Sequence, residues 1–125
     1  RFHGPLLQLV QLLCEGHFGG MQRFLCRQPW GLHSVDTPRF LVQYVAAAWA
    51  GGAAEAPTAQ AIAALSELMQ GPCREAQRQA VAAGAAEVLL GVVASSAPRD
   101  DEKAPADPAV VSAALEALRA LVEGH

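Results

Sequence analysis

The chain has 125 residues, a formal net charge of −3 at pH 7 and a composition that is 52% hydrophobic. Its length fits one domain or a piece of a larger protein. Because 26 residues are Ala, the burial of apolar volume rests on Leu, Val, Ile, Phe and Trp, and we expect marginal stability. The mildly acidic balance, without any Lys/Arg block, argues against nucleic acid or an anionic membrane surface as the main partner.

Cysteine usage and the lengths of the apolar runs limit the class of protein further. Cys14, Cys26 and Cys73 form no CxxC pair, and an odd number cannot all pair within one chain, so we expect reduced thiols in a cytosolic setting. No apolar run approaches the ~18 residues that cross a bilayer, and no signal peptide is visible. Because the chain opens on Arg1 rather than Met, we expect a fragment of a larger protein.

The N-terminal half predicts three helices. Apolar steps of three and four residues place on one face of the first helix Leu6, Leu9, Val10, Leu13, Cys14 and His17. Gly16 and the Gly19-Gly20 pair should end it and start a shorter helix, which Pro29-Trp30-Gly31 closes. Asp36-Thr37-Pro38 then supplies an N-cap and a first-turn proline. The helix that follows stops at Gly51-Gly52, and one of its sides consists of Phe40, Leu41, Tyr44, Val45 and Ala48.

A fourth helix is expected from Thr58, its predicted N-cap, to Gly71-Pro72, which is a usual order for a helix end. Its inward residues should be Ile62, Leu65 and Met69.

The rest of the chain predicts three more helices and one long loop. Residues 73–83 read as a polar helix with a narrow apolar edge, and residues 85–95 as a helix with buried valines and leucine. The segment 95–107 is rich in Ser, Pro and charge and is expected to be a flexible loop. Asp107-Pro108 should cap a last helix, whose apolar residues are Val111, Ala114, Leu115, Leu118 and Val122.

These patterns predict an all-α fold, because no period-two alternation is long enough for a strand. Helix pairs joined by short turns are typical of an armadillo- or HEAT-like α-solenoid segment, and an irregular helical bundle of about six to seven helices is the other architecture they allow. We expect residues 1–125 to form a single helical domain.

Two short strings carry the candidate chemistry: Leu12-Leu13-Cys14-Glu15-Gly16-His17 and Leu65-Ser66-Glu67-Leu68-Met69-Gln70-Gly71-Pro72-Cys73. Each places a carboxylate near the predicted end of an apolar helix, where unpaired backbone carbonyls also gather. Such oxygens suit a hard cation such as calcium better than they suit a proton donor. We therefore predict that Glu15 and Glu67 contact one calcium ion, with His17 and Gln70 in support. Spacing alone favours a plainer alternative, in which both acids are exposed or paired with Arg23, Arg27 or Arg74.

Other chemistry finds little support in the sequence. Cys14, His17, Cys26 and Cys73 could converge on zinc, but no pair has finger spacing, so core thiols are the favoured interpretation. We expect no enzymatic activity, because no nucleophile with a base, phosphate loop or paired acid–base motif is present. Trp30 and Trp49 are expected to be core anchors.

The two strings resemble the helical associated domain shared by inositol trisphosphate receptors and ryanodine receptors, the intracellular calcium-release channels. The first match consists of Leu9-Val10-Gln11-Leu12-Leu13-Cys14-Glu15-Gly16-His17, Gln22, Phe24-Leu25 and Gln28. The second consists of Leu65-Ser66-Glu67, Gln70-Gly71-Pro72-Cys73 and Gln77. Residues 85–94 and 110–123 match only in apolar pattern.

The resemblance implies a cytosolic regulatory segment of a ligand-gated calcium-release channel at the endoplasmic or sarcoplasmic reticulum membrane. It implies Glu15 and Glu67 as calcium-activation ligands, supported by His17 and Gln70, in a weak site completed by a residue outside this chain. The implied partners are other domains of the parent channel, a homotetramer, with no nucleic acid and no membrane span in this segment. The alternative is a structural armadillo-like scaffold that binds protein surfaces without an ion.

Overall fold

The computed structural model describes residues 3–16, 19–31, 33–51, 56–95 and 107–124. These described residues form seven α-helices and no strand, which confirms the all-α prediction. The helices are α1 (His3–Cys14), α2 (Gly19–Cys26), α3 (Thr37–Ala50), α4 (Ala56–Met69), α5 (Arg74–Ala82), α6 (Ala85–Ala94) and α7 (Pro108–Val122). The predicted loop at 95–107 lies, apart from its two end residues, outside the described residues.

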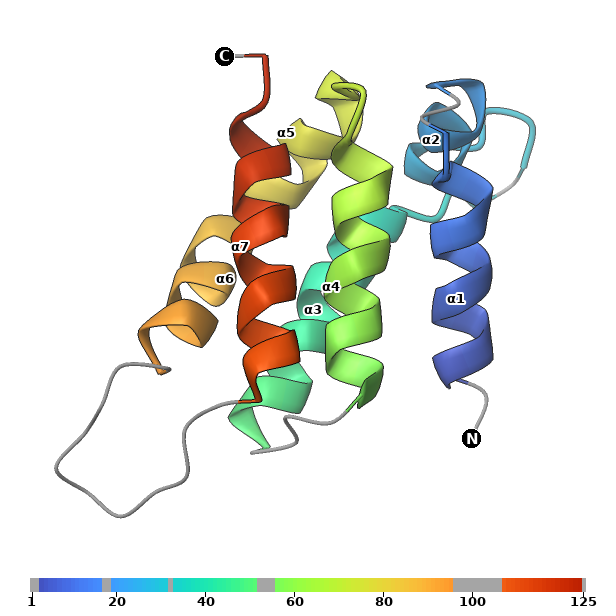
Figure 1. The fold of residues 1–125 in the computed structure, drawn as a ribbon. Coiled ribbons are helices and arrows are strands. Elements are labelled where there is room, and N and C mark those ends of the chain that lie inside the picture. The colour runs from blue at the N-terminus through green and yellow to red at the C-terminus, as the bar shows by residue number, and fades with distance from the viewer. Residues whose placement is uncertain (1–2, 17–18, 32, 52–55, 96–106, 125) are drawn as a thin grey trace, which may run out of the picture.

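Helix α4 occupies the centre of the molecule. It packs against α7 on one side, α1 on another and α3 behind it, while α6 packs on α7 (Figure 1). Helices α1 and α4 run in the same direction, so their C-terminal ends lie at the same end of the bundle, where α2 and α5 also lie (Figure 1). Both sequence strings therefore belong to one end of the fold.

Three helix ends are explained by a single residue each, an N-cap aspartate or a glycine. Asp36 accepts a hydrogen bond from Arg39 N at 2.9 Å, and Asp107 accepts one from Ala109 N at 2.9 Å, so both predicted N-caps are confirmed. Gly71 follows α4 with φ of 120°, a backbone conformation that favours glycine.

The predicted N-cap at Thr58 is wrong. Helix α4 begins two residues earlier, at Ala56, and Thr58 is a buried residue of the first helical turn. Pro57 explains the difference, because a proline is well tolerated in the first turn and its fixed φ suits a helix start.

The core faces of the outer helices differ from prediction. Helix α1 buries Leu7 and Cys14, with Val10 packed against the core, but exposes four leucines: Leu6, Leu9, Leu12 and Leu13. It lies at the edge of the bundle and packs mainly on α4, so one narrow stripe is enough to make that contact. A helix that is apolar nearly all round does not specify which stripe it will bury.

In helices α3 and α7 the buried face also differs from the predicted one. Phe40 and Leu115 are exposed although the apolar pattern placed them with the core residues. Helix α7 instead buries a stripe that is mostly valine and alanine, with one leucine: Val110, Ala114, Ala117, Ala120 and Leu121. Small side chains let α7 approach α4 closely. The apolar pattern instead favoured the larger leucines as core residues.

The inward residues predicted for α4, Ile62, Leu65 and Met69, are confirmed, and Leu68 is buried with them. Ile62, Leu65, Leu68 and Met69 are fully buried, and they join residues of the other helices in one hydrophobic cluster. Because α4 contacts other helices on several sides, all four apolar side chains can be buried.

Candidate functional site

The two sequence strings meet at one end of the bundle. Glu15 directly follows α1, and Glu67 lies in the last turn of α4, three residues before Gln70. The negative charge of Glu67 contributes to the raised pKa of the thiol of Cys14, the last residue of α1.

A buried glutamine binds α2, the helix that follows the first string, to the second string. Gln22 in α2 is 2% exposed, and its Nε2 donates to Glu67 O at 2.9 Å and to Gln70 O at 2.6 Å. Both acceptors are carbonyls at the C-terminal end of α4, which have no partner within an ideal helix. One side chain thus satisfies the end of α4 and holds α2 against it.

The environments of the two carboxylates differ. Glu15 is exposed, and the next residue, Gly16, has φ of 81°, which turns the chain away from α1. Glu67 is half-buried. Between described residues no ion pair engages either carboxylate, and Arg74 instead donates to Gly124 O at 2.9 Å.

Burial is the main cause that raises the pKa of the Cys14 thiol to about 11, followed by the charges of Glu67 and Cys73. Cys14 is therefore an uncharged core thiol at neutral pH.

The two supporting positions have separate outcomes. Gln70 donates from Nε2 to Ser66 Oγ at 3.2 Å, accepts from Gln22 through its carbonyl, and borders a hollow beside Glu116 and Arg119 of α7. His17 lies outside the described residues. The described residues also contain no group of three or more His, Cys, Asp and Glu side chains placed to hold a metal ion.

Sequence reasoning gave no role to Gln22 and Gln77, which belong to the two family matches, and both bind helix ends in the structure. Gln77 is 2% exposed, and its Nε2 donates to Ala120 O at 2.8 Å and Glu123 O at 3.0 Å at the end of α7. Its Oε1 is buried without a hydrogen-bond partner. Gln22 and Gln77 thus play the same role, since each side-chain amide donates to two carbonyls at the end of another helix. The sequence feature that could have indicated this role is a glutamine among apolar or small residues.

The three cysteines gather at the same end of the molecule. All are buried and unpaired by any disulfide, in agreement with the prediction of reduced core thiols. Cys26 ends α2, and Cys73 is the N-cap of α5. The thiol of Cys26, and then the backbone N–H groups of Ala76 and Glu75, lower the pKa of Cys73 from 9.0 to about 6 against the opposing effect of burial. The thiol of Cys73, and then burial, raise the pKa of Cys26.

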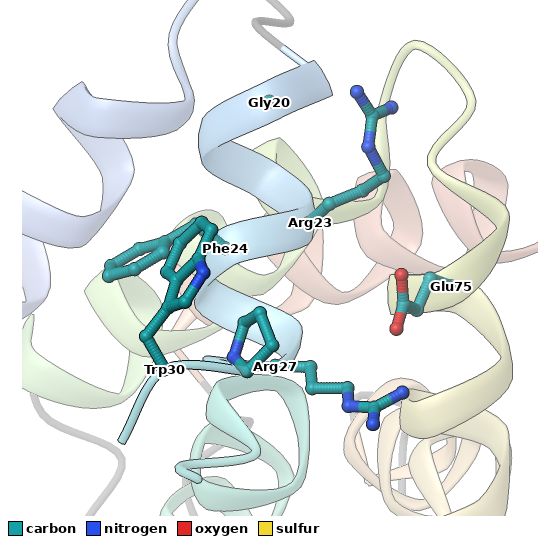
Figure 2. A pocket seen from close by; sticks show the side chains of 7 residues that line it. Gly20, Arg23, Phe24, Arg27, Trp30 and Glu75 are labelled. Atoms are coloured by element: carbon teal, nitrogen blue, oxygen red, sulfur yellow. The ribbon is translucent and has the colours of Figure 1, made fainter.

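A second surface feature lies between α2 and α5. A shallow cavity of about 420 Å³ is lined by Gly20, Arg23, Phe24, Arg27, Pro29, Trp30 and Glu75. Figure 2 shows the rings of Phe24 and Trp30 together on one side of α2, with both arginines extending toward the side where Glu75 lies. The prediction of Trp30 as a core anchor is wrong, because it is 87% exposed. It follows α2 in a surface turn, where no core element covers it.

Together these observations define an all-helical domain in which the ends of α1 and α4, which carry the two sequence strings, lie at one end of the bundle. The family model described as "RyR and IP3R Homology associated" matches residues 2–92, and the chain belongs to this family. The resemblance inferred from the two strings is thereby confirmed. No curated protein and no solved structure matches the chain. Within the part of the chain that the structure describes, no helix has the length and apolar character needed to cross a membrane.

Proposed function

We propose that this domain is a cytosolic regulatory segment of an intracellular ligand-gated calcium-release channel. Family membership supports the channel assignment. The single observation that supports a shared site is the double hydrogen bond of Gln22, which fastens α2, the helix that follows the first string, to the carbonyls of Glu67 and Gln70. The homotetrameric parent channel, and the cytosolic face of the endoplasmic or sarcoplasmic reticulum membrane, are part of the proposal.

In this proposal, Glu15 and Glu67 each supply a carboxylate to one regulatory calcium ion. The donor set fits, because calcium prefers carboxylate and carbonyl oxygens, and no ion pair between described residues competes for either acid. Gln22 already engages the carbonyls of Glu67 and Gln70, so the carboxylates are the main donors of this segment. A further ligand comes from another domain of the channel, with His17 and Gln70 in support.

The ion would act by joining helix ends to that other domain. Glu15 follows α1 and Glu67 lies in the last turn of α4, so an ion on both carboxylates fixes the end of the bundle in one arrangement. A ligand shifts an equilibrium only through its different affinities for the two states. Calcium therefore favours opening if the third ligand reaches this pair in the open channel and not in the closed one.

The test is the calcium dependence of channel opening in the full-length protein. Glu15→Gln and Glu67→Gln each remove one negative donor at little change of volume and should raise the half-activating calcium concentration by roughly tenfold or more. Glu87→Gln, at an exposed position in the first turn of α6, is the matched control and should leave it unchanged. Unaltered calcium dependence in both test variants, with normal assembly, would contradict the proposed site.

A second function, a protein-interaction scaffold without an ion, has one observation in its favour. Trp30 is 87% exposed beside Phe24 and two arginines, and Trp and Arg are the residue types that dominate binding energy at interfaces. A photoreactive amino acid in place of Trp30, in the full-length protein, should crosslink to another domain if the cavity is an interface. Crosslinking there together with calcium dependence unchanged in both glutamate variants would favour this function over the first.

A further inference from the structure

The cavity between α2 and α5 presents an aromatic surface and a basic surface next to each other. Its lining includes the rings of Phe24 and Trp30 and the side chains of Arg23 and Arg27. Phe24 is 45% exposed and Trp30 is 87% exposed, so both rings are open to a second molecule. In Figure 2 the two rings lie together on one side of α2, while both arginines extend from α2 toward α5.

The two arginines carry positive charge that the described part of the fold does not neutralise. Arg23 and Arg27 are four residues apart on α2, a spacing at which like charges destabilise a helix. No ion pair between described residues engages either guanidinium group, and the one carboxylate of the lining is that of the half-buried Glu75. The cavity is therefore locally basic on a chain whose net charge is −3. Carboxylates of a partner would remove the repulsion and can bind each guanidinium through two parallel hydrogen bonds.

The segment that carries Trp30 is held at both ends by one glutamine. Gln28 Nε2 donates to Phe24 O at 2.5 Å and to Val35 O at 3.1 Å, and Val35 N donates to Gln28 Oε1 at 2.5 Å. The amide of Gln28 thus joins the last turns of α2 to Val35, and Trp30 lies between them in the sequence. An exposed ring on a segment whose ends are already fixed loses less conformational freedom when a partner binds.

We propose that this cavity docks an acidic segment of another polypeptide that also carries an apolar side chain. Carboxylates of the segment bind Arg23 and Arg27, and its apolar side chain packs on Trp30 and Phe24. The proposal rests on the second candidate function, whose partner it specifies, and it is independent of the calcium ligands. Nucleic acid fits less well, because Glu75 lines the cavity and the chain is acidic. An anionic membrane also fits less well, because membrane-binding clusters contain more basic residues than this pair.

The experiment titrates the full chain with a short synthetic peptide of Glu and Leu and follows the tryptophan indole N–H signals by NMR. The signal of Trp30 is assigned by its loss in Trp30→Phe. We expect this signal to shift until the site is saturated, while that of Trp49, which packs against the core, stays in place. A peptide with Gln in place of every Glu should bind more weakly by roughly tenfold or more. The affinity for the Glu peptide should decrease with added salt, because salt screens exposed charges.

Variants separate this cavity from general attraction to a basic side chain. Arg23→Gln together with Arg27→Gln should weaken binding of the Glu peptide by roughly tenfold or more. Arg39→Gln together with Arg119→Gln is the matched control, because both arginines are exposed, on α3 and α7, and the change in net charge is the same. This control pair should leave the affinity unchanged. Trp30→Ala should also weaken binding, and circular dichroism checks that each variant stays folded.

Several results would overturn the acidic partner. They are equal losses of affinity in the two arginine pairs, equal binding of the Glu and Gln peptides, and no shift of the Trp30 signal with either peptide. A shift of that signal by a single-stranded oligonucleotide or by phosphatidylserine vesicles, but not by the Glu peptide, would do the same. A crosslink from position 30 to another channel domain, without binding of the Glu peptide, would leave the scaffold function standing and remove only the acidic partner. Because the unsubstituted chain alone distinguishes the peptides, the test does not depend on a variant that folds.

Discussion

Removal of the Gln22 amide should loosen the end of the bundle where the two strings meet. Gln22→Met keeps the length and the buried volume of the side chain but deletes the donor that binds Glu67 O at 2.9 Å and Gln70 O at 2.6 Å. Each lost hydrogen bond should cost about 0.5–1.5 kcal/mol, and both carbonyls are left without this partner. The expected decrease in the free energy of unfolding is therefore about 1–3 kcal/mol.

Urea unfolding of the full chain, followed by circular dichroism, measures this decrease. Gln43→Met is the matched control, because Gln43 is exposed on α3 and should change the free energy of unfolding by less than about 0.5 kcal/mol. A Gln22→Met variant as stable as the unsubstituted chain would refute the role given to this amide. It would also remove the main support for a fixed contact between α2 and the end of α4.

The remaining predictions concern a helix cap, an exposed aromatic residue and a thiol. Asp36→Ala deletes the hydrogen bond to Arg39 N and should lower the free energy of unfolding by about 1 kcal/mol in the same assay, while Asp36→Asn should recover most of it. Trp30→Ala should change that free energy by less than about 0.5 kcal/mol, since the side chain is 87% exposed, and a larger loss would place Trp30 in the core. The alkylation rate of Cys73 should fall as pH decreases through about 6, because the thiolate reacts and its pKa is lowered to that value. In Cys26→Ala the midpoint should move upward toward 9.0, since the main cause of the lowering is gone, and an unmoved midpoint would contradict the thiol pair.

The sequence predicted what local chemistry decides. Asp36 and Asp107 cap helices because a short carboxylate before a first-turn proline satisfies a free backbone N–H wherever the helix then packs. Gly71 ends α4 because the left-handed conformation there favours glycine in any tertiary setting. Thr58 shows the limit of this reasoning, since the proline before it allowed an earlier start.

What tertiary packing decides could not be predicted from the sequence. The leucines of α1 occupy nearly every face, so only its position at the edge of the bundle determines that Leu7 and Cys14 are buried while Leu6 and Leu9 are exposed. Trp30 was placed in the core by residue type, although the surface turn that carries it offers no cover.

The candidate site was predicted in part. The resemblance identified the two strings, and the family match confirms it. That α1 and α4 end side by side depends on their parallel packing (Figure 1), which spacing along the chain cannot give. The glutamines were missed for the same reason, because Gln22 and Gln77 donate to carbonyls more than forty residues away.

The central claim is that two acidic side chains of this segment share one regulatory ion. The most direct measurement is an experimental structure of the full-length channel in saturating calcium. The account predicts one ion bonded to carboxylate oxygens of both Glu15 and Glu67 at about 2.3–2.6 Å, with a further ligand from another domain. Density for an ion that touches neither glutamate, or none at this end of α1 and α4, would contradict it.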